Sequence, residues 1–229
     1  MATTKKLVCL ANSRKHGGRC VAGIEIKSNS WIRPVSSRPG HEVSAAERQY
    51  PSGAEPGLLD IVSMRLIKPK PIGFHRENWL VDSSVRWQKK GQIGWDELCL
   101  LEEPSTRLWR NGYHTNAGNN DRVPADQEGT VMESLKLIRV DEATIQVDHP
   151  WSNDARPTVR AQFQHAGSVY SLRVTDPVCE ERFRGRGIGR YPLGNSFLTI
   201  SLSEKFDGYL YKLVAAVIER AKVEPSGRR

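Results

Sequence analysis

The chain has 229 residues, of which 38% are hydrophobic, and its 34 lysines and arginines outnumber its 26 acidic residues to give a formal net charge of +8. This length suffices for one large β domain or two small ones, and no apolar run approaches the roughly 20 residues that a membrane-spanning helix needs. The apolar run after the opening MATTKK is too short for a secretory signal, so we expect a cytoplasmic protein.

The positive charge is concentrated at the start of the chain. Residues 1–38 contain eight lysines and arginines and a single acid, Glu25, whereas the remaining residues are nearly neutral. A local excess of cations of this kind is typical of a surface that binds a polyanion.

The first predicted element is a β-hairpin. Two apolar runs, residues 7–11 and 20–26, are separated by the polar, glycine-bearing residues 12–19, which favour a turn. The connection supplies three candidate phosphate-binding cations, whose alternative interpretation is a solvated basic loop. They are Arg14, Lys15 and Arg19.

An extended segment, Trp31-Ile32-Arg33-Pro34, follows the hairpin. Side chains alternate along such a segment, so we expect Ile32 to face the core and Trp31 to share the other face with Arg33. A guanidinium beside an exposed aromatic ring suits a phosphate and a stacked base. The alternative is a tryptophan packed in the core.

The middle of the chain predicts short elements and then a boundary. We expect a helix near residues 44–49, strands near 58–67 and 74–82, and one or two helical turns within 94–101. Turn-forming residues dominate positions 102–128, which predicts a mobile loop between two domains. We place the first domain at residues 1–115 and the second at 116–229.

The second half shows period-two alternation of apolar and polar residues at 143–148, 158–165 and 170–174, with a glycine turn before the last. This pattern predicts a β-hairpin and a neighbouring strand with one wet face. Residues 198–202 predict a further strand, and Asp176 before Pro177 predicts a strand-ending turn. Residues 209–220 fit both an amphipathic helix and a buried closing strand.

Residues 182–190, RFRGRGIGR, followed by a tyrosine, form a second basic cluster that contains no acid. Arginine and glycine interleaved with aromatic residues can follow a phosphate backbone while flat groups stack on bases. The alternative is a flexible loop with solvated charge. The candidate binding residues here are Arg184, Arg186, Arg190 and Tyr191.

Sequence motifs give no sign of a cofactor, a metal or a catalytic centre. The GRGIG stretch lacks dinucleotide-binding spacing, and no phosphate-binding Walker sequence occurs. His75 and Glu77 match half of a zinc-deaminase signature, but the cysteine half is missing, so we interpret the triplet as accidental. The cysteines are scattered, with no pair at metal-binding spacing, and we expect reduced thiols.

Several segments resemble the dual OB-containing domain family of bacterial proteins. They are KLVCLANSRK (6–15), GRCVAG (18–23), WIRPV (31–35), LDIV (59–62), ENWLVD (77–82), YSLRVTDP (170–177), SLSEKF (201–206) and YKLVA (211–215). The resemblance implies a mostly β fold of two OB-like β-barrels in tandem with a few short helices. It also favours a strand at 211–218, and it carries over no catalytic residue.

We therefore expect a non-enzymatic nucleic-acid-binding protein within a larger bacterial nucleic-acid-processing or defence machinery. OB barrels offer a curved face on which single-stranded DNA or RNA can lie. One rival is a module that binds a nucleotide or modified base through Asn12, Ser13, Trp31 and Asn78. Another is an adaptor whose barrels contact a protein partner.

Overall fold

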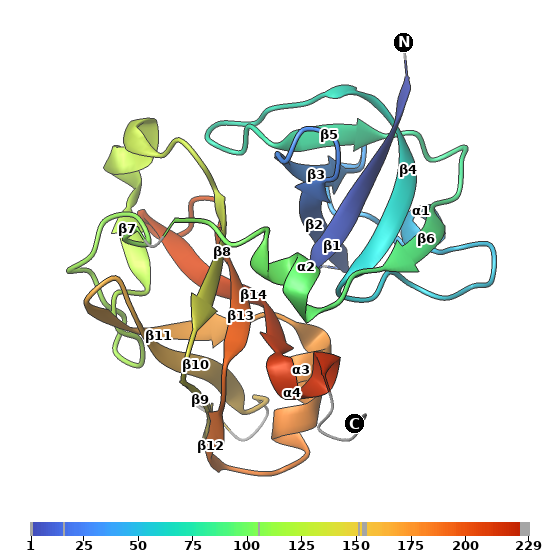
Figure 1. The fold of residues 1–229 in the computed structure, drawn as a ribbon. Coiled ribbons are helices and arrows are strands. Elements are labelled where there is room, and N and C mark those ends of the chain that lie inside the picture. The colour runs from blue at the N-terminus through green and yellow to red at the C-terminus, as the bar shows by residue number, and fades with distance from the viewer. Residues whose placement is uncertain (1, 16, 105, 151, 153–154, 225–229) are drawn as a thin grey trace. The chain divides into compact units, whose positions relative to one another are not determined.

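The computed structural model describes residues 2–15, 17–104, 106–150, 152 and 155–224. The protein is mostly β, with a few short helices. It divides into two compact units (Figure 1). The first unit contains Met1–Leu101 and Met132–Ser134, and the second contains Glu102–Val131 and Leu135–Arg229.

This division falls after Leu101, whereas the sequence placed the boundary after residue 115. Residues 102–115 belong with the second unit because Leu108 is fully buried in its core and donates its N–H to the hydroxyl of Tyr170 at 3.3 Å. The side-chain amide of Asn111 donates to the same hydroxyl at 2.9 Å. Leu108 and Asn111 thus attach this stretch to the second sheet, and its mobility stays a prediction.

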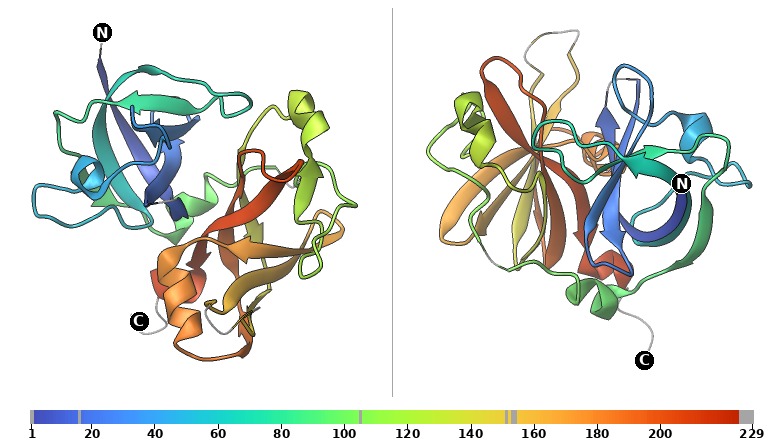
Figure 2. Two further views of the ribbon diagram at one scale, coloured as in Figure 1. Left: turned by 180° about the vertical axis from the view of Figure 1, so that it is seen from behind. Right: turned by 90° about the horizontal axis from the view of Figure 1, so that it is seen from above.

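In its described residues, the first unit contains six strands and two short helices. The strands are β1 (Thr3–Lys15), β2 (Gly18–Glu25), β3 (Trp31–Val35), β4 (Asp60–Pro69), β5 (Asn78–Val81) and β6 (Gln88–Gln92), and the helices are α1 (Ala45–Arg48) and α2 (Trp95–Cys99). The order β1-β2-β3-β5-β4 closes on itself because β4 also pairs with β1 (Figures 1 and 2). The result is a closed five-stranded barrel, with β6 attached to β4.

Alternating side chains fill this barrel. Leu7 and Cys9 from β1, Ile32 from β3 and Met64 from β4 are all buried in one cluster. Where β1 meets β2, Gly23 lies so close that an added Cβ would sit 2.0 Å from the carbonyl oxygen of Val8. Glycine is therefore required at this contact, beside the bulge between Cys9 and Ala11 that helps the sheet to curl.

The second unit is a larger sheet. Its strands are β7 (Arg122–Pro124), β8 (Leu135–Val140), β9 (Ala143–Asp148), β10 (Thr158–His165), β11 (Ser168–Val174), β12 (Gly189–Leu193), β13 (Ser196–Leu202) and β14 (Tyr209–Glu219), accompanied by η1 (Ala125–Thr130), α3 (Pro177–Arg184) and α4 (Arg220–Val223). The strand order is β12-β9-β10-β11-β14-β13-β8, with β7 paired to β14. The strands predicted at 143–148, 158–165 and 170–174 are confirmed, and 209–219 forms a strand, as the resemblance implied.

Helix α3 corrects two expectations. Asp176 does not end a strand in a turn but caps this helix, since its carboxylate accepts the N–H groups of Val178 and Cys179 at 2.9 and 3.1 Å. Pro177 occupies the first helical turn, where its missing N–H costs nothing. The basic cluster at 182–190 is also not one loop, because its first three residues form the last turn of α3.

None of the helices in the described part of the chain combines the length and apolar character needed to cross a bilayer.

Candidate nucleic-acid interface

The hairpin of the first unit brings three predicted cations to one end of the barrel. Arg14 on β1 lies directly opposite Arg19 on β2, and Lys15 lies opposite Gly18. Arg14 is exposed and the other two are half-buried. The arrangement offers a concentrated positive charge at the barrel end.

Trp31 begins β3, opposite Ile24 on β2. Ile32 is buried in the core cluster, as the alternation predicted, whereas Trp31 is half-buried on the opposite face. Trp31 is therefore neither a fully packed core residue nor a fully exposed one, and base stacking by Trp31 stays a prediction.

Arg33 is placed differently from the other predicted cations. Its side chain is buried, and its Nη1 lies 2.9 Å from Oε1 of Glu77. Its Nη2 donates to the hydroxyl of Ser134 at 2.9 Å, and that hydroxyl donates to the same carboxylate oxygen at 2.5 Å. The charge of Arg33 is thus neutralised inside the first unit, which removes Arg33 from the candidate interface.

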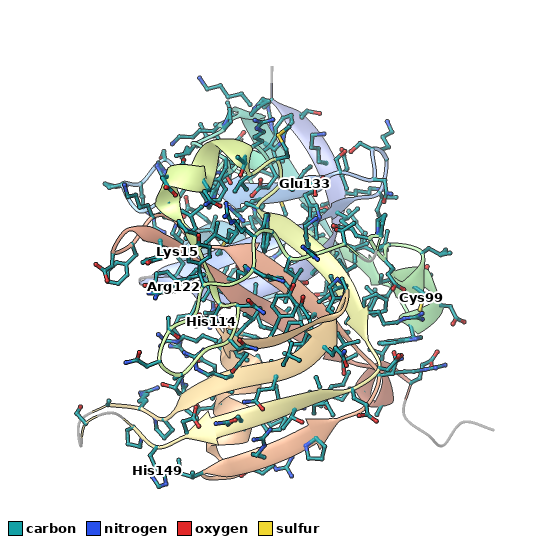
Figure 3. The ribbon with its side chains drawn as sticks, turned by 90° about the vertical axis from the view of Figure 1, so that its left-hand side faces the viewer. Lys15, Cys99, His114, Arg122, Glu133 and His149 are labelled. Atoms are coloured by element: carbon teal, nitrogen blue, oxygen red, sulfur yellow. The ribbon has the colours of Figure 1, made fainter. Side chains whose placement is uncertain are left out.

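His75 completes this internal network. Nη1 of Arg33 contacts Nδ1 of His75, and because a guanidinium can only donate, this ring nitrogen must accept. Burial, followed by the positive charges of Arg33 and Lys15, lowers the pKa of His75 to about 3. Lys15, labelled in Figure 3, therefore acts electrostatically on the same network. We interpreted the residues 75–77 as an accidental match to an enzyme signature. In the structure they precede β5, which pairs with β3, so His75 and Glu77 both contact the side chain of Arg33.

In the second unit, two of the four arginines in residues 182–190 are ion-paired, and one of them, Arg184, is a predicted binding residue. Arg182 contacts Glu219 at 2.6 Å. Arg184 contacts Glu180 at 2.6 Å and donates to the carbonyl of Pro157 at 2.8 Å. The absence of acids within residues 182–190 was misleading, since one partner lies four residues earlier on α3 and the other lies on β14. These two arginines stabilise the unit.

The other two arginines of this segment are exposed. The guanidinium of Arg186 lies 4.1 Å from the ring centre of Tyr191, whose hydroxyl contacts the carbonyl oxygens of Arg186 and Gly187 at 2.8 Å. Arg190, on β12, donates to the amide oxygen of Gln162 on β10. The turn is thereby held in shape while both cations face solvent.

Arg190 belongs to a row that crosses four strands. In the sheet register, Arg190 lies opposite Gln146, Gln146 opposite Arg160, and Arg160 opposite Arg173. We call these four residues the arginine row. With neighbouring strands about 4.8 Å apart, the row spans roughly 14 Å.

The arginine row lies on the outer face of the sheet. The residues that alternate with it, including Val147, Ala161 and Leu172, are buried in the core. Arg160 is buried, and its Nη1 lies 3.5 Å from a carboxylate oxygen of Asp121, whereas Arg190 and Arg173 are exposed. The row could not be predicted from local sequence patterns, because its members come together only through the strand order.

No group of three or more histidine, cysteine, aspartate or glutamate side chains in the described ranges is arranged to hold a metal ion. All four cysteines are free thiols.

A closed five-stranded barrel, a second curved sheet and basic outer surfaces define a mostly β protein of tandem OB type. A family model described as "Dual OB-containing domain" matches residues 5–217, and the chain belongs to this family.

Two further comparisons accompany this assignment. A solved structure, "Crystal structure of the tetrameric p202 HIN2", is similar over 92% of this chain and 87% of that chain, with 8% identity and a TM-score of 0.29. A search of curated proteins found no match.

Proposed function

We propose that this protein is a non-enzymatic nucleic-acid-binding protein that prefers single-stranded DNA or RNA. Membership of a dual OB family supports nucleic-acid binding in general. OB barrels present a curved sheet face and flanking loops on which a single strand can lie.

The arginine row is the observation that carries the proposal. Its exposed ends, Arg190 and Arg173, stand on one sheet face. Tyr191 follows Arg190 on β12 and packs against the core on the other face, where the guanidinium of Arg186 covers its ring. Arginine presents a planar, permanently charged group that suits phosphate oxygens. The basic hairpin with Arg14, Lys15 and Arg19 supplies a second cationic surface, in the first unit.

A salt series of binding to fluorescent single- and double-stranded oligonucleotides tests the proposal. Affinity should fall steeply with salt, because each phosphate that a cation neutralises adds about 0.7 to the slope for single strands. The double variant Arg173→Ala with Arg190→Ala should weaken binding and flatten the slope by about 1.4.

Arg139→Ala is the matched control. Arg139 is an exposed arginine on β8 of the same sheet, and its Nε lies 3.3 Å from a carboxylate oxygen of Glu102. Its loss removes a charge already balanced by an acid, so affinity should change little. Equal affinities for the wild type and the double variant would refute the role of the arginine row.

The rival nucleotide-binding function rests on two amides of the first unit. Oδ1 of Asn12 and Oδ1 of Asn78 are buried without a hydrogen-bond partner among the described residues. Tight binding of a mononucleotide that is insensitive to salt would favour this rival. Trp31→Ala should lower mononucleotide binding in that case as well.

A further inference from the structure

The turn between β13 and β14 presents an exposed aromatic side chain on a rigid support. Phe206 is 72% exposed, which rules out a role in the core. Its backbone N–H donates to the carbonyl of Tyr209 at 2.9 Å, and the N–H of Tyr209 donates back at 3.0 Å. Asp207 and Gly208 between them adopt left-handed backbone angles, which close the turn tightly. The ring of Phe206 is therefore held out from the sheet.

Further flat groups surround this ring. The ring of Tyr211 lies 6.2 Å from that of Phe206 at an interplanar angle of 53°. The guanidinium of Arg122, labelled in Figure 3, lies 3.9 Å above the ring of Tyr209. We call Phe206, Tyr209, Tyr211 and Arg122 the aromatic tip.

The aromatic tip shares its sheet face with the arginine row. Arg173 on β11 is in register with Leu213 on the parallel strand β14. Tyr211 and Tyr209 precede Leu213 by two and four residues, so both point to the same side. Leu210 and Lys212, which alternate with them, are buried. Along β14, the step from Leu213 to Tyr211 covers about 7 Å.

Charge attraction does not explain the aromatic tip. Glu204 and Asp207 flank Phe206 in the turn and offset Lys205 and Arg122. The aromatic tip instead offers exposed ring faces. A single-stranded nucleic acid whose phosphates follow the arginine row would have its bases within reach of these rings. Aromatic rings stack on any base, because every base has a flat face.

We propose that the aromatic tip binds the unpaired bases of a single-stranded nucleic acid whose phosphates contact the arginine row. This inference rests on the proposed function and deepens it, because it gives the preference for single strands a structural origin. In a duplex the bases are paired and stacked, and an exposed ring cannot reach their faces without extruding them.

The test compares a short single-stranded thymidine oligonucleotide with an abasic strand of the same length, which keeps the sugars and phosphates. The full chain should bind the base-bearing strand more tightly. Phe206→Ala and Phe206→Leu should each lower that affinity by about 5- to 140-fold and leave affinity for the abasic strand and the salt slope unchanged. Val178→Ala, a control at a 76% exposed position on α3, should have no effect.

Each other outcome counts against the inference. If the wild type binds both strands equally, the aromatic tip does not read bases, although nucleic-acid binding stands. If no strand binds, the proposed function and this inference fall together. If the Phe206 variants change the oligomeric state in gel filtration without changing affinity, the tip contacts a second copy of the chain instead.

Discussion

Protonation of His75 should destabilise the protein between pH 6.5 and pH 3. In the folded state Nδ1 accepts from the buried guanidinium of Arg33, and burial together with Arg33 and Lys15 lowers the pKa to about 3. The unfolded chain has an ordinary histidine pKa near 6.5 and takes up a proton first, so acid favours unfolding. Stability from this group is complete above pH 6.5 and is lost progressively as pH falls toward 3.

The size of the effect follows from the two pKa values. At pH 5.0 the pH is 1.5 units below the pKa of the histidine in the unfolded chain, while the histidine of the folded protein is still neutral. The free energy of unfolding is therefore lower by about 2 kcal/mol than it is where both forms are neutral. Urea unfolding at pH 7.0 and pH 5.0, followed by tryptophan fluorescence, measures it, since Trp87 is fully buried in the first unit.

The variant His75→Gln keeps an acceptor for Arg33 but cannot titrate. Its free energy of unfolding should fall about 2 kcal/mol less than that of the wild type between the two pH values. His165, whose pKa burial also lowers, titrates in both proteins and cancels in the comparison. Parallel losses in the two proteins would show that His75 is free to take a proton in the folded state.

Two further predictions concern charged side chains of the second unit. Arg184→Ala should lower the free energy of unfolding in urea by about 1–3 kcal/mol, because it removes an ionic partner from the buried Glu180. Arg186→Ala should change the free energy of unfolding by no more than about 0.5 kcal/mol. Equal losses for the two variants would contradict a structural role that only Arg184 has. Burial lowers the pKa of Lys212 to about 7, although the nearby charge of Asp121 raises it. Between pH 7 and pH 10 this lysine is therefore protonated in the unfolded chain and neutral in the folded one, so the free energy of unfolding should rise with pH over this range. Lys212→Met should flatten that rise, and an unchanged slope would place its cause elsewhere.

The sequence predicted the strands of the second sheet well where one face is wet. Residues 143–148 and 158–165 alternate because their outer side chains meet solvent and their inner ones meet the core. Residues 209–219 did not show this, since five of their consecutive side chains, Val214–Ile218, are buried and the pattern of apolar residues also fits a helix. The family resemblance, rather than periodicity, indicated the strand.

The candidate site was harder to predict because it depends on partners distant in sequence. Arg33 looked like a surface cation until Glu77, 44 residues later, proved to lie beside it. Arg184 looked unpaired because its helix, which begins with Asp176 and Pro177, was interpreted as a turn. The arginine row requires the strand order β12-β9-β10-β11, and local patterns carry no information about which strands become neighbours.

The strand order also bears on self-association. An unpaired strand edge can recruit another chain and begin aggregation. Ring closure gives β1 a partner on both sides and leaves β6 at the end of the first sheet, where it carries Lys89 and Lys90. In the second sheet, β12 contains Pro192, and the outer side of β8 is occupied by Glu103, whose N–H donates to Leu137 at 3.2 Å. Each of these edges thus has a charge, a proline or a covering segment, which disfavours pairing with the edge of a second chain.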